Sequence, residues 1–97
     1  MSRHRGGGKF GKVQNSWPFV TLAIESDCIL MSTILQEALM KRECIQEIVL
    51  QKYGLNYRFI FKHNDPSIKK EIEFWAFRPD PVKEALKLYG YSVSENR

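Results

Sequence analysis

The amino-acid sequence predicts an α+β domain, with a mostly antiparallel sheet and one C-terminal helix. Residues 19–25 and 28–34 are apolar segments separated by a short polar turn, which is typical of a hairpin. Residues 56–63 and 70–77 alternate between apolar and polar side chains around a second turn. Residues 80–90 have the start signal, spacing and stop signal of an amphipathic helix.

Length and composition indicate one small globular domain. The 97 residues suffice for a single hydrophobic core, and 43% of them are hydrophobic. No apolar run is long enough to cross a bilayer, and the basic N-terminus is not followed by the apolar stretch of a secretory signal. We therefore expect a cytoplasmic protein without a membrane span, in which Cys28 and Cys44 are reduced residues of the core.

Residues 1–16 are predicted to form a disordered, basic, glycine-rich tail that precedes a domain over residues 17–97. Three consecutive glycines and a polar segment offer little to offset the entropy of ordering. The chain's net charge of +4 originates here, since residues 17–97 are formally neutral. The tail either contacts a polyanion such as nucleic acid or has no role; its basic residues are Arg3, Arg5, Lys9 and Lys12.

The segment 33–53 allows two interpretations. Its apolar residues fall mostly on one helical face, Thr33 and Gln36 have capping-box spacing, and Gly54 could end a helix. Residues 44–53 also alternate imperfectly, as a strand would. The helix would give a ββαββα two-layer sandwich, and the strand would give a sheet closed by one helix.

The final helix has the clearest pattern. Asp80 is expected as the N-cap and Pro81 as the first helical residue, where its missing N–H costs nothing. Apolar residues follow at helical spacing, and Gly90 is suited to the position after the helix. The remaining residues, 92–97, are expected to fray.

No constellation in the sequence predicts catalysis, a metal site or a cofactor. His4 lies in the predicted tail, and His63 stands alone at a strand end before a turn. The only glycine run has no strand before it, so it is not a phosphate-binding loop. The chain is therefore expected not to be an enzyme. The aromatic face near the end of the second hairpin is the first candidate interface, comprising Trp75, Phe77 and Arg78.

Residues 17–93 resemble a family of small bacterial domains with a pleckstrin-homology-like fold. The shared features are an opening Trp-Pro strand, a hydrophobic hairpin, an I-x-x-I segment at residues 45–48, a Phe-Trp-x-Phe strand end at residues 74–77, and a terminal helix that ends in glycine. The resemblance implies a bent sheet or partly open barrel with one C-terminal helix, and a strand over residues 45–52. Five strands are clear in the sequence, fewer than the seven of a full barrel.

The resemblance implies a binding or self-assembly module, most plainly one for protein–protein interaction or a homo-oligomer. Phosphoinositide binding is not expected, because residues 25–27, taken as the first hairpin loop, are acidic. The alternative function is nucleic-acid binding through the basic tail, with an affinity that falls steeply with salt.

Overall fold

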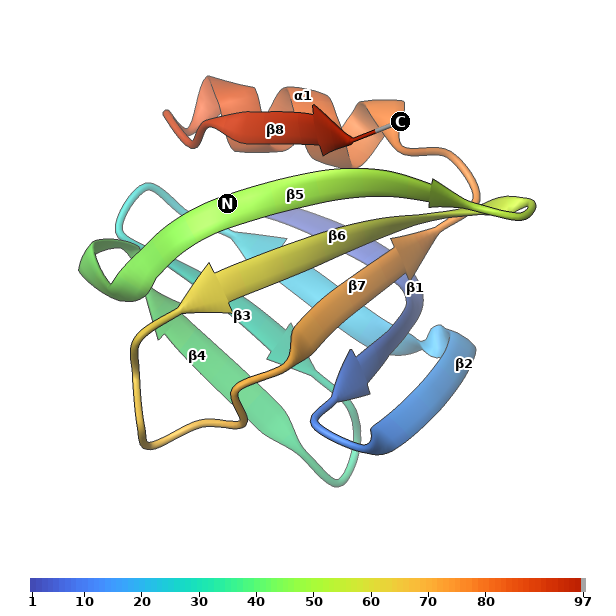
Figure 1. Ribbon diagram of the computed structural model, residues 1–97, viewed down its shortest axis with the longest axis horizontal. Helices are drawn as coiled ribbons and strands as arrows, with labels where there is room; N and C mark the ends of the chain where they lie inside the picture. The colour runs from blue at the N-terminus through green and yellow to red at the C-terminus, as the bar shows by residue number, and fades with distance from the viewer. Residues whose placement is uncertain (97) are drawn as a thin grey trace.

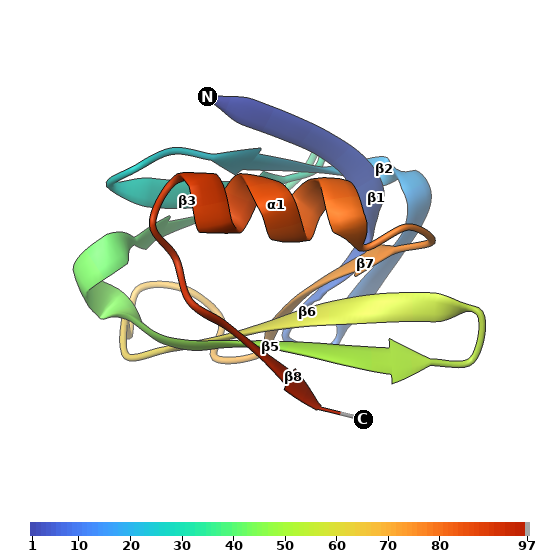
Figure 2. The ribbon, with the colours of Figure 1, turned by 90° about the horizontal axis from the view of Figure 1, so that it is seen from above.

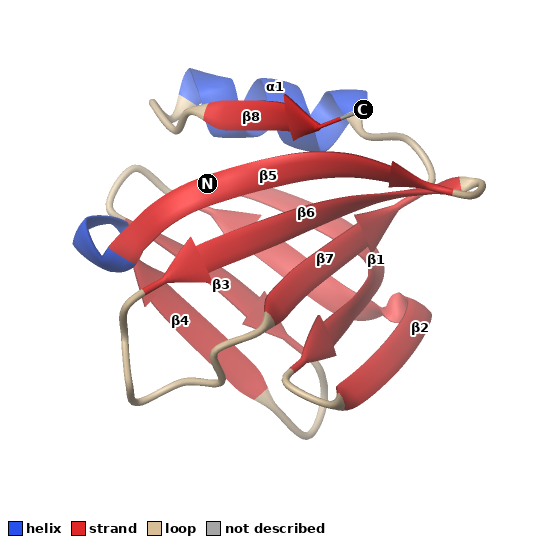
Figure 3. Ribbon diagram, viewed as in Figure 1, coloured by secondary structure: helices blue, strands red, loops and turns tan. Residues whose placement is uncertain are grey.

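The structure is a computed structural model that describes residues 1–96. It contains eight strands, one 3₁₀ turn and one α-helix in this range (Figure 3). In chain order the elements are β1 (Ser2–Phe10), β2 (Val13–Ile24), β3 (Cys28–Ser32), β4 (Glu37–Lys41), η1 (Arg42–Cys44), β5 (Ile45–Tyr53), β6 (Asn56–His63), β7 (Ile72–Ala76), α1 (Asp80–Leu88) and β8 (Val93–Asn96).

The strands form a single curled sheet in the order β4-β3-β2-β1-β7-β6-β5-β8. All neighbours are antiparallel except β5 and β8. The sheet curves around its apolar face as a half-barrel, and α1 lies at one end of it (Figure 1). This confirms the predicted α+β class and the bent, mostly antiparallel sheet with one helix. The ββαββα sandwich is wrong.

The central strand β1 corrects the prediction of a disordered tail. Residues 2–10 pair with β2 on one side, and residues 7–10 pair with β7 on the other. The glycine run is buried where the chain passes between these two strands. A Cβ on Gly8 would lie 2.6 Å from the carbonyl oxygen of Glu73, and one on Gly7 would lie 2.9 Å from that of Asn15. The glycines are therefore a packing requirement, and composition alone misidentified them as flexible.

Both predicted hairpins are present. The β2–β3 ladder pairs residues 21–24 with residues 29–32, and the β6–β7 ladder pairs residues 57–61 with residues 72–76. Segment 33–53 contains β4, η1 and β5, which confirms the strand over residues 45–52. Pairing with other strands overrides the weak helical pattern of this segment. β4 joins the half of the sheet that contains β3, and β5 joins the half that contains β6, and the local sequence predicts neither partner.

The helix α1 covers the open end of the half-barrel. Seen from above, it lies across the space between β3 and β6 (Figure 2). Its buried residues are Val82, Ala85 and Leu86. Asp80 is the first helical residue and not the predicted N-cap; Pro79 holds that position, and no side chain caps the N-terminus. Gly90 has a φ of +85° and lies just beyond the helix end, as predicted.

The C-terminal segment is ordered in the described range, in contrast to the predicted fraying. Strand β8 runs parallel to β5, with Val93 opposite Ile48 and Glu95 opposite Leu50. The half-buried Val93 packs against the core, and Glu95 lies 3.1 Å from Lys83 Nζ of α1. A short strand is fixed here because one side meets a sheet edge and the other meets the helix.

The core fills the concave side of the sheet beneath α1 and contains side chains from strands β1 to β7. Cys28 and Cys44 are free thiols that lie at its margin, half-buried, and not inside it as expected. The largest fully buried side chains are Phe10, Leu22, Ile24, Ile29, Met31, Met40, Ile48, Phe59, Phe61, Ile72, Phe74 and Leu86.

Arg42 of η1 joins the two halves of the sheet to the end of the helix. Its guanidinium donates to the carbonyl oxygens of Ser26 at 2.7 Å, Tyr89 at 2.9 Å and Gly90 at 2.5 Å. It also lies over the ring of Tyr91, 4.6 Å from the centroid. Tyr91 in turn donates its hydroxyl proton to the carbonyl oxygen of Glu25 at 2.7 Å. These contacts tie the β2–β3 turn to the residues that follow α1.

We expect Arg42→Ala to lower the free energy of unfolding by about 2 kcal/mol, because three carbonyls lose a charged donor and Tyr91 loses its cation. Arg42→Lys should recover less than half, since an ammonium cannot span three carbonyls as a planar guanidinium does. Urea unfolding measures both. Arg78→Ala is the control, an exposed arginine for which the described residues offer no ion pair; an equal loss in that variant would contradict the assignment.

Candidate binding site

The face carrying Trp75 is occupied by contacts within the chain. Trp75 is half-buried, and its indole N–H donates to Glu73 Oε1 at 3.0 Å. Arg58 lies against the ring of Tyr53, 3.6 Å from its centroid, and 5.5 Å from that of Trp75. The same guanidinium is 3.6 Å from Glu73 Oε1. Arg58, Glu73 and the Trp75 indole N–H therefore already have partners within the chain.

The other two residues of the sequence-predicted interface lie beyond that stack. Phe77 is 59% exposed and Arg78 is exposed in the segment between β7 and α1. Neither lines the β2-side hollows at residues 13–36 or the hollows beside η1 and α1. Trp75 is therefore held by contacts within the chain, whereas Phe77 and Arg78 are exposed to solvent. The three residues do not line one of these hollows together.

The four basic residues of the predicted tail lie on and beside β1. Arg3 and Arg5 are exposed on one face of the strand, opposite Ala23 and Thr21 of β2. Lys9 is paired with Glu71 at 2.9 Å, which raises the pKa of Lys9 and lowers that of Glu71. Lys12 is exposed in the β1–β2 turn. Strand pairing therefore fixes the backbone that carries these residues, and one of the four, Lys9, is neutralised by its ion pair.

The β1–β2 turn also alters the basis of one expectation. The first hairpin of the structure joins β1 to β2 through Gly11 and Lys12, so its loop is basic. The acidic residues 25–27 form the turn between β2 and β3, which is the second hairpin. Residues 25–27 are therefore not the first hairpin loop, and their acidity gives no reason to exclude phosphoinositide binding.

An apolar groove lies at the end of the sheet opposite α1, and we call it the β2 groove. It has a volume of about 420 Å³. Ile34 and Leu35, in the β3–β4 turn, are each 95% exposed, and Val13 and Phe19 of β2 are more than half exposed. Its lining residues are Val13, Asn15, Phe19, Thr33, Ile34, Leu35 and Gln36.

The β3–β4 turn holds its two apolar side chains outward by a local hydrogen-bond arrangement. Thr33 Oγ1 accepts from the backbone N–H of Leu35 at 3.3 Å and of Gln36 at 3.1 Å. The Thr33 N–H donates to the Gln36 carbonyl at 2.7 Å. With the backbone turned in this way, Ile34 and Leu35 project into solvent, where two adjacent large aliphatic side chains are a recognised mark of an interaction site.

Sequence reasoning missed these residues. The periodicity of segment 33–53 assigned Ile34 and Leu35 to the buried face of a possible helix. A signal was present, because Ser32 and Thr33 follow an apolar strand and would start a turn. Once they are placed in a turn, the next two apolar residues have no core to enter.

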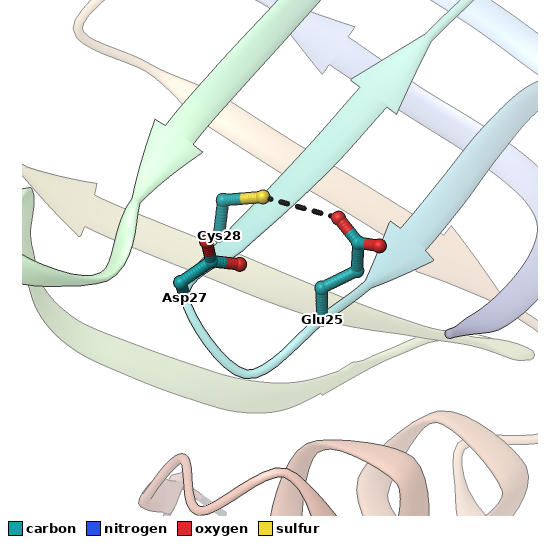
Figure 4. A group of neighbouring side chains, drawn as sticks. All are labelled: Glu25, Asp27 and Cys28. Carbon is teal, nitrogen blue, oxygen red and sulfur yellow. Dashed lines mark hydrogen bonds between the residues drawn. The ribbon is translucent and has the colours of Figure 1, made fainter.

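A second cluster groups Glu25, Asp27 and Cys28 at the β2–β3 turn (Figure 4). One ligand atom from each lies within 4.8 Å of the others, a spacing that suits a metal ion. In the structure Cys28 Sγ donates to Glu25 Oε2 at 3.4 Å. Burial and the neighbouring carboxylates raise the pKa of Cys28 to about 11. The thiolate that a metal ion would bind therefore forms less readily here than in an ordinary cysteine.

This raised pKa predicts slow alkylation of Cys28. In a Cys44→Ser background at about pH 8.5, iodoacetamide should react with Cys28 roughly tenfold or more slowly than in the urea-unfolded chain, because the folded state holds far less thiolate. Adding Glu25→Gln and Asp27→Asn should raise the folded-state rate by removing two repelling charges. Mass spectrometry of the alkylated chain gives the rates. Equal rates in folded and unfolded chains would refute the raised pKa.

The two histidines serve structural contacts. His63 is buried, and its ring nitrogens contact the Lys69 carbonyl oxygen at 2.8 Å and the Asp65 N–H at 3.1 Å, which shapes the β6–β7 loop. His4 Nε2 is 2.7 Å from Ser2 Oγ, and burial lowers the pKa of this imidazole. Neither histidine lines the β2 groove.

No protein-family model matches the chain, and no curated protein matches its sequence. No helix within residues 1–96 has the length and apolar character required to cross a membrane.

Proposed function

We propose that the chain is a pleckstrin-homology-like binding module that docks a protein partner in the β2 groove. The observation that carries this proposal is the pair Ile34 and Leu35, each 95% exposed beside Val13 and Phe19. Exposure of four large apolar side chains around one hollow is unfavourable for an isolated domain, and a partner that covers them would gain roughly 25 cal/mol for each Å² of apolar area removed from water.

The strand order supports the fold part of the proposal. Strands β1–β4 are consecutive neighbours, β5–β7 are consecutive neighbours, and β1 connects the two groups. A C-terminal helix at one end of such a sheet is what the sequence resemblance implies. The fold itself does not choose a ligand, so the functional part rests on the groove.

The nucleic-acid alternative has less support. A flexible basic arm was its basis, and residues 2–10 form the central strand of the sheet instead. The aromatic Trp75 face offers no free stacking platform, because Arg58 lies against its rings and Glu73 holds the indole N–H. We do not propose it as the function.

Peptide selection with NMR mapping tests the proposal. Peptides selected from a random display library on the full chain should shift backbone amides of residues 13–19 and 33–36. The double variant Ile34→Ser/Leu35→Ser should lose these peptides by at least about tenfold in affinity. Leu55→Ser is the matched control, because Leu55 is a 90% exposed aliphatic residue in the β5–β6 turn. Peptides that map elsewhere, or that bind the double variant unchanged, would contradict the proposal.

A further inference from the structure

We infer that the partner segment in the β2 groove is acidic as well as apolar, an inference that rests on the proposed function. The groove is apolar along its floor and is flanked by basic side chains that have no carboxylate partner. Arg5 lines an adjacent hollow of about 320 Å³ that shares Phe19, Thr33 and Ile34 with the β2 groove. Lys12 adjoins Val13 at the other end.

The chain's own acids, in the part that the structure describes, leave these side chains without an ion pair, although the charge of Lys12 also contributes to lowering the pKa of Glu71. Among residues 1–96, no carboxylate oxygen lies within 4.0 Å of Arg3, Arg5 or Lys12, whereas Lys9 is paired with Glu71. The register places Arg5, Thr21, Ser32 and Glu37 in one row across the sheet. The backbone of Glu37 is thus three strand spacings, about 14 Å, from the backbone of Arg5.

The positions of Arg3 and Arg5 extend this basic margin. The two residues are two positions apart on β1 and therefore share one face of the strand. Their partners in β2, Ala23 and Thr21, lie on the same face as Phe19. A carboxylate carried by a bound segment would meet a planar, multiply donating guanidinium beside the groove. The apolar side chains of the bound segment would enter the groove between Val13 and Leu35.

The backbone at the groove suits an extended segment. Residues 13–15 of β2 pair with β1, whereas the β3 ladder begins only at Thr21, so within the described chain one edge of residues 13–15 has no strand beside it. Asn15, which lines the groove, also has a buried side-chain amide nitrogen without a hydrogen-bond acceptor. A segment added beside β2 would pair with the free backbone edge of residues 13–15.

A second copy of the chain fits this surface less well. A second copy would bring the same basic residues, Lys12 and Arg5, to the shared interface, and like charges across an interface oppose association. The charge pattern therefore favours a separate, acidic protein segment.

Three labelled synthetic peptides of about a dozen residues test the inference by fluorescence anisotropy with the full chain. All share the same alternating Val and Leu residues, and the intervening positions are Glu, Gln or Lys. We expect the Glu peptide to bind about tenfold more tightly than the Gln peptide at low salt, and the Lys peptide to bind least. Added salt should reduce the difference.

Charge reversal separates the acidic preference from apolar docking. Arg5→Glu should abolish the preference for the Glu peptide, whereas Arg78→Glu, an exposed arginine remote from the groove lining, should leave it intact. Ile34→Ser/Leu35→Ser should weaken all the peptides.

The possible failures are distinguishable. Equal binding of the three peptides, lost in the Ile34→Ser/Leu35→Ser variant, would overturn the acidic preference and leave the proposed docking site standing. Binding that none of these substitutions alters would overturn both. Chain dimers that dissociate on Ile34→Ser/Leu35→Ser in sedimentation, or anionic phosphatidylserine vesicles bound in place of the peptides with the same dependence on Arg5, would also overturn the inference.

Discussion

Replacing Gly6 by alanine should prevent the chain from folding. A Cβ at this position would overlap the carbonyl oxygen of Trp75 and lie 2.7 Å from Cζ of Phe74. Neither obstacle can move freely, because Trp75 belongs to the strand that flanks β1 and Phe74 is fully buried. We expect a loss of at least about 4 kcal/mol, which approaches the whole stability of a small domain. Circular dichroism and urea unfolding would show a largely unfolded chain.

Gly54→Ala is the control for that result. Nothing lies within 4 Å of a Cβ built on Gly54, but its φ of +61° disfavours a side chain. Its cost should be only about 1 kcal/mol, from backbone conformation alone. If Gly6→Ala and Gly54→Ala lost similar amounts of stability, close packing of β1 against β7 would not be the reason for the glycine run.

Leu86→Ala should cost about 2 to 5 kcal/mol, the range found when a fully buried leucine is truncated. Leu86 belongs to α1 and is completely buried on the side of the helix that covers the end of the half-barrel. The cavity would weaken the one element that covers this end, so we expect a lower urea midpoint together with increased binding of a hydrophobic dye. Thermal and urea unfolding measure the loss.

The same helix provides a matched comparison. Leu88 is two residues further along and 81% exposed, so Leu88→Ala should change stability by less than about 0.5 kcal/mol. Helix propensity changes in the same way in both variants, and only burial differs. Equal destabilisation by the two substitutions would mean that α1 does not seal the core.

The elements that the sequence predicted correctly are those with strong local signals. Pro81 and Gly90 bracket α1, and the alternation of residues 57–63 and 72–76 specifies two strands whose apolar faces are buried. Such patterns depend on a residue and its near neighbours. They require no knowledge of the rest of the chain.

The errors have a common physical origin in long-range pairing. Gly6, Gly7 and Gly8 look flexible until β7 is known to lie against them. β8 looks too polar to be ordered until β5 offers it an edge. The β2 groove was missed for the same reason, because Val13 and Leu35 are 22 positions apart and meet only when the sheet curls. Asp80 is a local error of one position at a helix start.

The position of β1 has a consequence for biosynthesis. Its residues leave the ribosome before those of β7, yet Gly7 pairs with Trp75, near the far end of the chain. Until β7 is synthesised, β1–β4 and the β5–β6 hairpin can pair, but the second edge of β1 has no partner strand. Such a topology folds slowly relative to helical proteins, and the waiting edge is open to other chains. The exposed arginines at positions 3 and 5 would then repel other nascent copies of the chain during that interval.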